Sequence, residues 1–187
     1  MKNIAIFASG KGTNAQAIIE YFRDHPSIKV ALIVTNNPAA GVIKIAHSNK
    51  IISAILTREA FDNQDLMFKL LDALNIELIV LAGFLQLVPT YLLEKFPNRV
   101  INIHPALLPK FGGKGMYGMK VHEAVLAAGE KETGISIHYV NEHYDEGQII
   151  SQHSTPVTDN DNAETLSKKV QALEHEWYPK MIEKMLS

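Results

Sequence analysis

The chain has 187 residues, 47% hydrophobic and 20% charged, with 18 Lys and Arg against 20 Asp and Glu and a formal net charge of −2. This composition excludes a wholly disordered chain and lacks the basic excess of a protein that coats nucleic acid. The absence of cysteine excludes disulfides, a thiolate nucleophile and Cys-ligated zinc. The sequence has no apolar run of membrane-spanning length and no signal-peptide pattern, so we expect one cytoplasmic domain with no membrane partner.

Short apolar runs and helical patterns alternate along the first hundred residues. The runs predict strands at 3–8, 29–34, 51–56, 76–82 and 99–103. Helices are predicted between them at 13–24, capped by Thr13, and at 40–49, 60–75 and 91–96. Fully apolar strands that alternate with helices indicate an α/β fold, a Rossmann-like doubly wound sheet that is mostly parallel with helices on both faces.

The second half has a different pattern. A Gly-rich loop at 110–120 precedes a predicted helix at 121–128. Strands are predicted at 135–140 and 148–154, and the short polar loop between them indicates an antiparallel pair. A closing helix is predicted over 163–186, kinked at Pro179. No repeat or linker interrupts the chain, so we expect a single domain over 1–187.

A glycine-rich turn follows the first predicted strand. Gly10, Gly12 and Ala15 match the G-x-G-x-x-G/A spacing, which lets the backbone approach an anion at a helix N-terminus. A plain tight turn capped by Thr13 is the alternative interpretation. A dinucleotide would require an acid at the end of the second strand, where residues 33–37 have none. The turn therefore predicts a monophosphate ligand in preference to NAD or ATP.

Asn102 and His104 form a candidate reactive pair. Residues two apart on a strand point to the same face, and this strand ends at the sheet edge where open α/β sheets bind ligands. An amide and an imidazole together can stabilise an oxyanion. Asp145, in the polar loop 141–147, is the candidate carboxylate that would raise the pKa of His104 and keep it cationic. A structural histidine and a plain turn residue are the alternatives, and no metal-binding motif is present.

Four segments together resemble the folate-dependent formyltransferases. They are residues 9–14, 81–84, 102–109 and 174–175. The sequence N-I-H-P-x-L-L-P is typical of the whole group, and S-G-x-G-[ST]-N is typical of the phosphoribosylglycinamide formyltransferases within it. The resemblance covers nearly the whole chain. It implies formyl transfer from the co-substrate 10-formyltetrahydrofolate to the amine of glycinamide ribonucleotide in purine biosynthesis, by a monomer or homodimer without a nucleic-acid partner.

The resemblance also assigns roles to individual residues. It implies that Asn102, protonated His104 and Asp145 are catalytic. The residues implied to bind the nucleotide substrate are Gly12, Thr13, Asn14 and Glu174. The residues implied to bind the folate are Leu85, Gln86, Leu87, Val88, Asn102, Asn141 and Asp145. It implies no metal, and it divides the domain into a nucleotide-binding half of about 1–100 and a catalytic, folate-binding half of about 101–187.

Two segments depart from the family pattern. Residues 61–64 are neutral where the family often carries a basic residue. Residues 112–120 form a longer loop than usual, which we interpret as a mobile lid over the nucleotide, with a surface loop as the alternative; His122 beyond it matches a frequent family histidine.

The sequence is also compatible with other functions. They include a formyl-folate deformylase, a nicotinamide-dependent oxidoreductase and a non-enzymatic module that binds a phosphorylated metabolite. Methionyl-tRNA formyltransferase is a further alternative, although we expect that enzyme to carry an RNA-binding surface and another C-terminal domain.

Overall fold

The computed structural model describes all residues from 1 to 187 and contains one seven-stranded sheet in the order β3-β2-β1-β4-β5-β6-β7. The strands are β1 (Lys2–Phe7), β2 (Ile28–Thr35), β3 (Ile52–Ile55), β4 (Ile76–Leu81), β5 (Val100–His104), β6 (Glu132–Tyr139) and β7 (Ile149–Pro156). Strands β1 to β5 pair in parallel, whereas β6 runs antiparallel to both β5 and β7. The mixed, mostly parallel sheet predicted from the sequence is confirmed.

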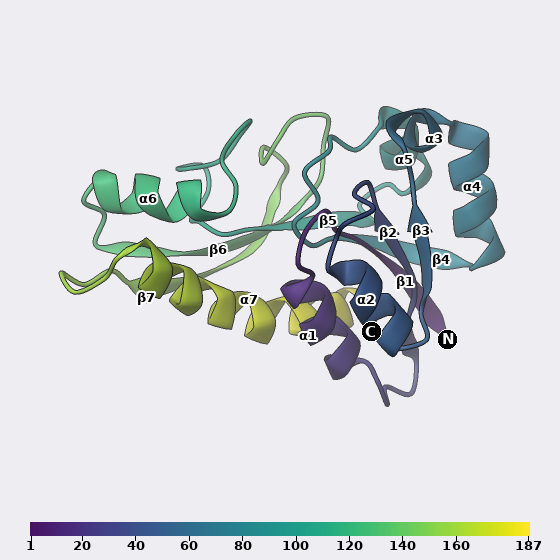
Figure 1. Cartoon of the computed structure of the whole chain (residues 1–187), viewed down its shortest axis with the longest axis horizontal. Coiled ribbons are helices and arrows are strands. Elements are labelled where there is room, and N and C mark those ends of the chain that lie inside the picture. The colour runs from purple at the N-terminus through teal and green to yellow at the C-terminus, as the bar shows by residue number, and fades with distance from the viewer.

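Helices cover both faces of the parallel strands (Figure 1). The helices are α1 (Thr13–Tyr21), α2 (Val42–Ser48), α3 (Arg58–Asp62), α4 (Gln64–Ala73), α5 (Thr90–Lys95), α6 (Met119–Ala127) and α7 (Ala163–Leu186). Strand β1 shows the two-sided packing directly. Its Ile4 and Ile6 join a core with α1, α2 and α7, whereas Ala5 and Phe7 join a second core with α3, α4 and α5. A fully apolar strand is required because neither face meets water.

Two local predictions are wrong. The helix predicted over 60–75 is interrupted at Asn63, which adopts an extended backbone and caps α4 by accepting a hydrogen bond from the Leu66 amide at 3.0 Å. Thr13 does not cap α1. The N-cap is Gly12, with φ of 82° and no side-chain cap, a left-handed conformation that glycine adopts without strain.

The antiparallel part of the sheet extends away from the parallel part, and α7 runs back from it to α1 (Figure 1). Helix α7 begins with a capping box at Asn162 and Thr165 and continues through Pro179 to Leu186. The Tyr178 hydroxyl, fully buried under the sheet, donates hydrogen bonds to the carbonyl oxygens of Leu81 and Ile101. Both carbonyls belong to parallel strands, β4 and β5, and the same helix also packs against β6 and β7, so α7 contacts both parts of the sheet.

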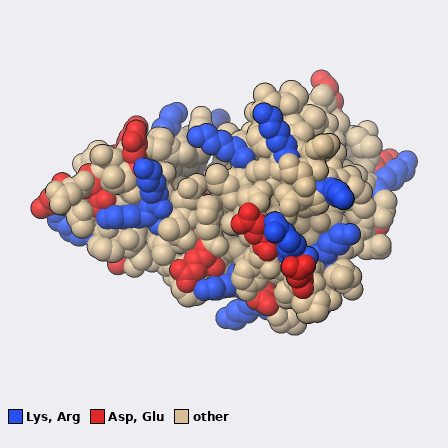
Figure 2. All heavy atoms as spheres, turned by 60° about the horizontal axis from the view of Figure 1, so that its bottom comes forward, with Lys and Arg blue, Asp and Glu red and all other residues tan.

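Basic and acidic side chains are interspersed among uncharged ones on the face that Figure 2 shows, as the near-zero net charge leads one to expect. No helix combines the length and apolar character that crossing a bilayer requires.

Candidate active site

A cavity of about 660 Å³ lies at the carboxyl edge of the parallel strands. Strands β1 and β4 are neighbours there although they are distant in sequence, which is the switch point where open α/β sheets bind ligands. The loops after these strands are tied together: the Ser9 amide donates to the Gly83 carbonyl oxygen, and the Leu85 amide donates to the Ser9 hydroxyl, each at 3.0 Å. Segments following β1, β4 and β5 and one face of α7 form the walls.

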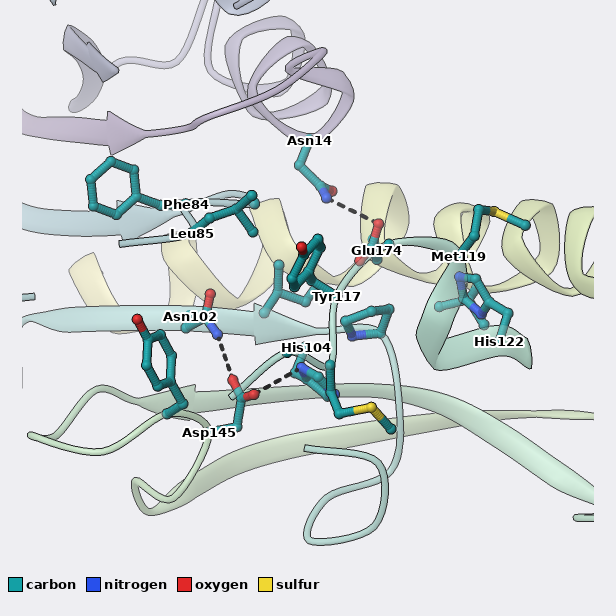
Figure 3. A pocket seen from close by; sticks show the side chains of 18 of the residues that line it. Asn14, Phe84, Leu85, Asn102, His104, Tyr117, Met119, His122, Asp145 and Glu174 are labelled. Carbon is teal, nitrogen blue, oxygen red and sulfur yellow. Dashed lines mark hydrogen bonds and ion pairs between the residues drawn. The ribbon is translucent and has the colours of Figure 1, made fainter. Parts of the chain in front are cut away.

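His104 and Asp145 form a buried pair at this cavity (Figure 3). The Nδ1 atom of His104 lies 3.4 Å from Oδ2 of Asp145, with 4% and 12% of the two side chains exposed. The other ring nitrogen, Nε2, lies 2.7 Å from the carbonyl oxygen of Phe111. Both ring nitrogens therefore face acceptors, an arrangement that a doubly protonated imidazole satisfies best.

Burial nevertheless lowers the pKa of His104 below its ordinary value. The Asp145 carboxylate and the Phe111 carbonyl act in the opposite direction, but they do not offset the loss of hydration. Asp145 thus acts in the predicted direction and raises the pKa of His104, but burial outweighs it, so the net pKa lies below the ordinary value. For Asp145 itself, burial acts to raise the pKa, but contacts with His138, His104 and the Gly113 amide together lower it.

Asn102 lies on the same face of β5 as His104 and contacts the same carboxylate. Its Nδ2 atom donates to Oδ1 of Asp145 at 3.3 Å and lies 3.1 Å from Nε2 of His138. His138 is directly opposite Asn102 in the pairing of β5 with β6. The structure thus brings together all three predicted catalytic residues and adds His138, which was not among the predicted site residues.

Polar side chains of β6 and β7 hold the segment that follows His104. The Ser136 hydroxyl donates to the carbonyl oxygen of Ala106 at 2.7 Å and accepts from the Leu108 amide at 2.9 Å. Gln152 donates to the Leu108 carbonyl oxygen at 3.0 Å and to the Ser136 hydroxyl at 2.8 Å. Neither Ser136 nor Gln152 was predicted, because their contribution depends on strand register, which the sequence did not define.

Asn14 and Glu174 meet on the opposite wall of the cavity (Figure 3). Asn14 Nδ2 donates to Oε2 of Glu174 at 3.0 Å, which joins α1 to α7. Burial raises the pKa of Glu174 to about 7, while the hydrogen bond from Asn14 acts weakly in the other direction. The side-chain oxygen of Asn14, Oδ1, is buried and has no hydrogen-bond partner. This wall of the cavity therefore offers a free acceptor to a ligand.

The other predicted binding residues are distributed more widely. Leu85 lines the large cavity, whereas Gln86, Leu87 and Val88 line an adjoining cavity of about 50 Å³. Gly12, Thr13 and Asn141 line neither of these two cavities. A Cβ on Gly12 would lie 2.9 Å from Val42, so the glycine allows α1 to pack closely against α2. The Thr13 hydroxyl accepts a hydrogen bond from Gln171 of α7.

The long Gly-rich segment forms part of the cavity wall. Residues 113–119 line it, and α6 begins within this wall at Met119. His122, on the first turns of α6, is 4% exposed and its Nδ1 has no partner; burial and the charge of His104 lower its pKa. The movement of this segment as a lid stays a prediction.

The chain is an α/β protein with a doubly wound sheet and a buried histidine–aspartate pair at the ligand-binding edge, an arrangement common in enzymes. The sequence matches the model of the formyl transferase family over residues 2–182. The chain therefore belongs to the formyl transferase family.

Individual relatives carry a more specific name. The chain is 36% identical to the phosphoribosylglycinamide formyltransferase of Bacillus subtilis, covering 100% of this chain and 95% of that protein. It is 41% identical to the chloroplastic phosphoribosylglycinamide formyltransferase of Arabidopsis thaliana, over 97% of this chain and 64% of that protein. The chain thus spans slightly less than two thirds of that plant relative's length.

Solved structures of similarly named proteins share the fold. The phosphoribosylglycinamide formyltransferase of Bacillus halodurans superposes with a TM-score of 0.88 at 38% identity, over 100% of this chain and 96% of that one. The glycinamide ribonucleotide transformylase 1 of Geobacillus kaustophilus gives 0.89 at 33% identity, with both chains fully covered.

Proposed function

We propose that this protein transfers the formyl group of 10-formyltetrahydrofolate to the amine of glycinamide ribonucleotide, a step of purine biosynthesis. The names of its relatives support this substrate pair. The observation that carries the proposal is the buried contact between His104 and Asp145 at the cavity, since a hydrogen-bond donor beside a proton acceptor supports reaction at a carbonyl.

The proposed reaction needs no covalent enzyme intermediate. The substrate amine attacks the formyl carbon, a C–N bond forms, and the formyl oxygen becomes an oxyanion. N–H groups of His104 and Asn102 stabilise that oxyanion. The bond from carbon to N10 of the folate then breaks, and the proton lost by the amine reaches N10 through water and Asp145. The products are the formylated amide and tetrahydrofolate.

His104 can take this part only after a local rearrangement. Its Nε2 hydrogen is used by the carbonyl oxygen of Phe111, a residue with φ of 56°. A substrate carbonyl oxygen would replace the Phe111 oxygen as the acceptor. We therefore assign residues 111–119 a role in closing the site around the reactants, which adds orientation to electrostatic stabilisation.

The two substrates would occupy different walls. Glu174 and Asn14 offer acceptors and a donor for the sugar hydroxyls of the nucleotide, and the apolar 84–88 segment, with Phe84 buried and Leu85 50% exposed, offers a surface for the flat pterin ring. In this proposal residues of about 101–187 supply the catalytic groups, whereas residues of about 1–100 supply Asn14 to the nucleotide and the 84–88 surface to the folate.

A spectrophotometric assay with 10-formyl-5,8-dideazafolate tests the proposal directly. We expect deformylation of the folate only when glycinamide ribonucleotide is present. Loss of formyl without the acceptor would identify a hydrolase instead, and no reaction under either condition would refute the proposal.

The His104→Ala and Asp145→Ala variants should lose turnover while retaining the native circular dichroism spectrum. The His47→Ala variant is a suitable control because His47 is exposed on α2 and lines neither cavity.

A further inference from the structure

His122 has no role in the reaction as proposed above, yet it lines the cavity and is only 4% exposed. It lies on α6. Its Nδ1 atom is completely buried without a hydrogen-bond partner, and Nε2 makes no hydrogen bond within the protein either. Buried polar side chains nearly always have a partner. An imidazole without one, at the wall of a cavity, therefore indicates a group that binds there.

The enclosure of Nδ1 determines how this ring can bind a ligand. Burial and the charge of His104 lower the pKa of His122, so the ring is neutral at pH 7 and has one N–H and one lone pair. A buried N–H without an acceptor is rarer than a buried acceptor without a donor. This favours Nε2 as the protonated nitrogen, and Nε2 is also the only ring nitrogen that a molecule in the cavity can reach. His122 then offers the cavity one neutral hydrogen-bond donor.

His122 lies on the side of the cavity assigned above to the nucleotide. Helix α6 packs against α7, and α7 supplies Glu174 to the cavity wall. The adjoining cavity beside the 84–88 segment has no lining residue from α6. Figure 3 shows His122 and Leu85 on opposite sides of the site. A ligand group that contacts His122 therefore belongs to the nucleotide substrate and not to the folate.

The proposed nucleotide substrate carries a suitable acceptor between its two anchored ends. In glycinamide ribonucleotide a single CH2 group separates the attacking amine from an amide carbonyl, and that amide joins the sugar. In the proposal above the amine approaches the formyl carbon beside His104, and the sugar hydroxyls lie at Glu174. His122 adjoins both ends, because the charge of His104 reaches its ring and its helix packs against the helix of Glu174. The amide oxygen is the acceptor that a neutral donor in this position fits.

We propose that His122 is a substrate-binding residue whose Nε2–H donates a hydrogen bond to the amide carbonyl oxygen of glycinamide ribonucleotide and so holds the neighbouring amine toward the formyl carbon. This inference rests on the proposed function for the identity of that carbonyl. A neutral donor suits an amide oxygen that stays uncharged, whereas His104 and Asn102 serve the oxygen that gains charge. The lone pair of His122 is enclosed at Nδ1, so this ring is not the base that takes the amine proton.

Two substitutions of His122 separate this role from a merely structural one. In His122→Asn the short amide can occupy the place of Nδ1 but leaves no donor at the Nε2 position, whereas in His122→Gln the longer side chain can keep an N–H there. We expect His122→Asn to raise the KM for glycinamide ribonucleotide about 5- to 30-fold with an unchanged KM for the folate, and His122→Gln to retain most of the wild-type kcat/KM. Equal losses in the two variants, or a wild-type KM in His122→Asn, would contradict the proposal. His47→Asn is the matched control on the exposed surface.

An analogue of the nucleotide in which CH2 replaces the amide carbonyl gives the decisive comparison. If His122 binds this carbonyl, then wild type and His122→Asn use the analogue with the same kcat/KM, because the interaction is already absent. A loss in His122→Asn as large with the analogue as with the natural substrate would overturn the proposal.

The tautomer and the contact can be measured without any assay of turnover. Nitrogen-15 chemical shifts of the His122 ring in the wild-type protein should show a bare Nδ1 and a protonated Nε2, and glycinamide ribonucleotide alone should shift the Nε2 signal. A protonated Nδ1, or an Nε2 signal that does not respond to the bound nucleotide, would refute the inference even if formyl transfer is confirmed. A wild-type protein that shows the expected signals but transfers no formyl group would support the inference and refute the proposed function.

Discussion

Replacing Glu174 by glutamine isolates the charge of one wall of the cavity. Burial raises the pKa of Glu174 from 4.5 to about 7, against a smaller opposing effect of its hydrogen bond from Asn14. Glutamine keeps the size of the side chain and an oxygen that can accept from Asn14, but it cannot ionise. The variant therefore differs from the wild type chiefly in a charge that appears as the pH rises.

The size and sign of the effect follow from proton linkage. Between pH 4.5 and 7 the folded protein retains a proton on Glu174 that the unfolded chain has released, so folding stability decreases as the pH rises through this window. The stabilising contribution of the protonated group is complete below about pH 4.5 and lost above pH 7. The difference between the two pKa values corresponds to about 3 kcal/mol. Because Glu174 keeps partial contact with water, we expect about 2 kcal/mol in solution.

Urea unfolding at pH 5 and pH 8 measures this contribution. We expect Glu174→Gln and wild type to have similar free energies of unfolding at pH 5, and the variant to be more stable by about 2 kcal/mol at pH 8. A gap between the two proteins that does not change with pH would show that the carboxyl group is not desolvated. In the formyl-transfer assay the same variant should raise the KM for glycinamide ribonucleotide more than it lowers kcat, since an ionised acceptor for hydroxyl groups is lost.

Three further substitutions test the scaffold and the reactive pair. Tyr178→Phe removes a fully buried hydroxyl that donates to two strand carbonyls, so urea unfolding should show a loss of about 1–3 kcal/mol; an unchanged midpoint would contradict this. Gly112→Ala would place a Cβ 2.5 Å from Leu108 and 3.2 Å from Asp145, so kinetics should show a fall in kcat as the carboxylate is displaced, and wild-type kcat would exclude such displacement. Asp145→Asn removes the charge that opposes burial, so NMR titration should show the pKa of His104 falling further below its ordinary value; an increase would refute the electrostatic account.

The sheet was predictable because its strands obey a local rule. A strand buried on both faces, such as β1, is a continuous apolar run, and the alternation of these runs with helices leaves few possible topologies. The break between α3 and α4 was not predictable in the same way. Asn63 is compatible with a helix by its neighbours' apolar spacing, but its side chain competes with the backbone and caps α4 instead.

Spacing alone predicted the part of the candidate site that lies on one strand, whereas the roles of Asp145, Asn14 and Glu174 rested on the resemblance to the family. Asn102 and His104 are two positions apart, so the strand period alone places them on one face. His138 and Ser136 show the same spacing on β6, but their placement opposite Asn102 and His104 depends on the register between two strands. The sequence predicts the two neighbouring strands but not their register, so it does not pair these residues.

The cavity is lined by residues from both predicted halves of the domain. Asn14 from the first half meets Glu174 from the second through a hydrogen bond that spans 160 positions of the chain, and the 83–85 segment lines the same cavity as His104. The candidate catalytic residues Asn102 and His104 lie on β5, which pairs with β6, whereas the cavity wall with Asn14 and Glu174 depends on the packing of α1 against α7. A nucleotide bound by Asn14 and Glu174 would therefore contact both halves of the domain. It would also contact α7, whose Tyr178 is hydrogen-bonded to the strands that carry Leu81 and Ile101.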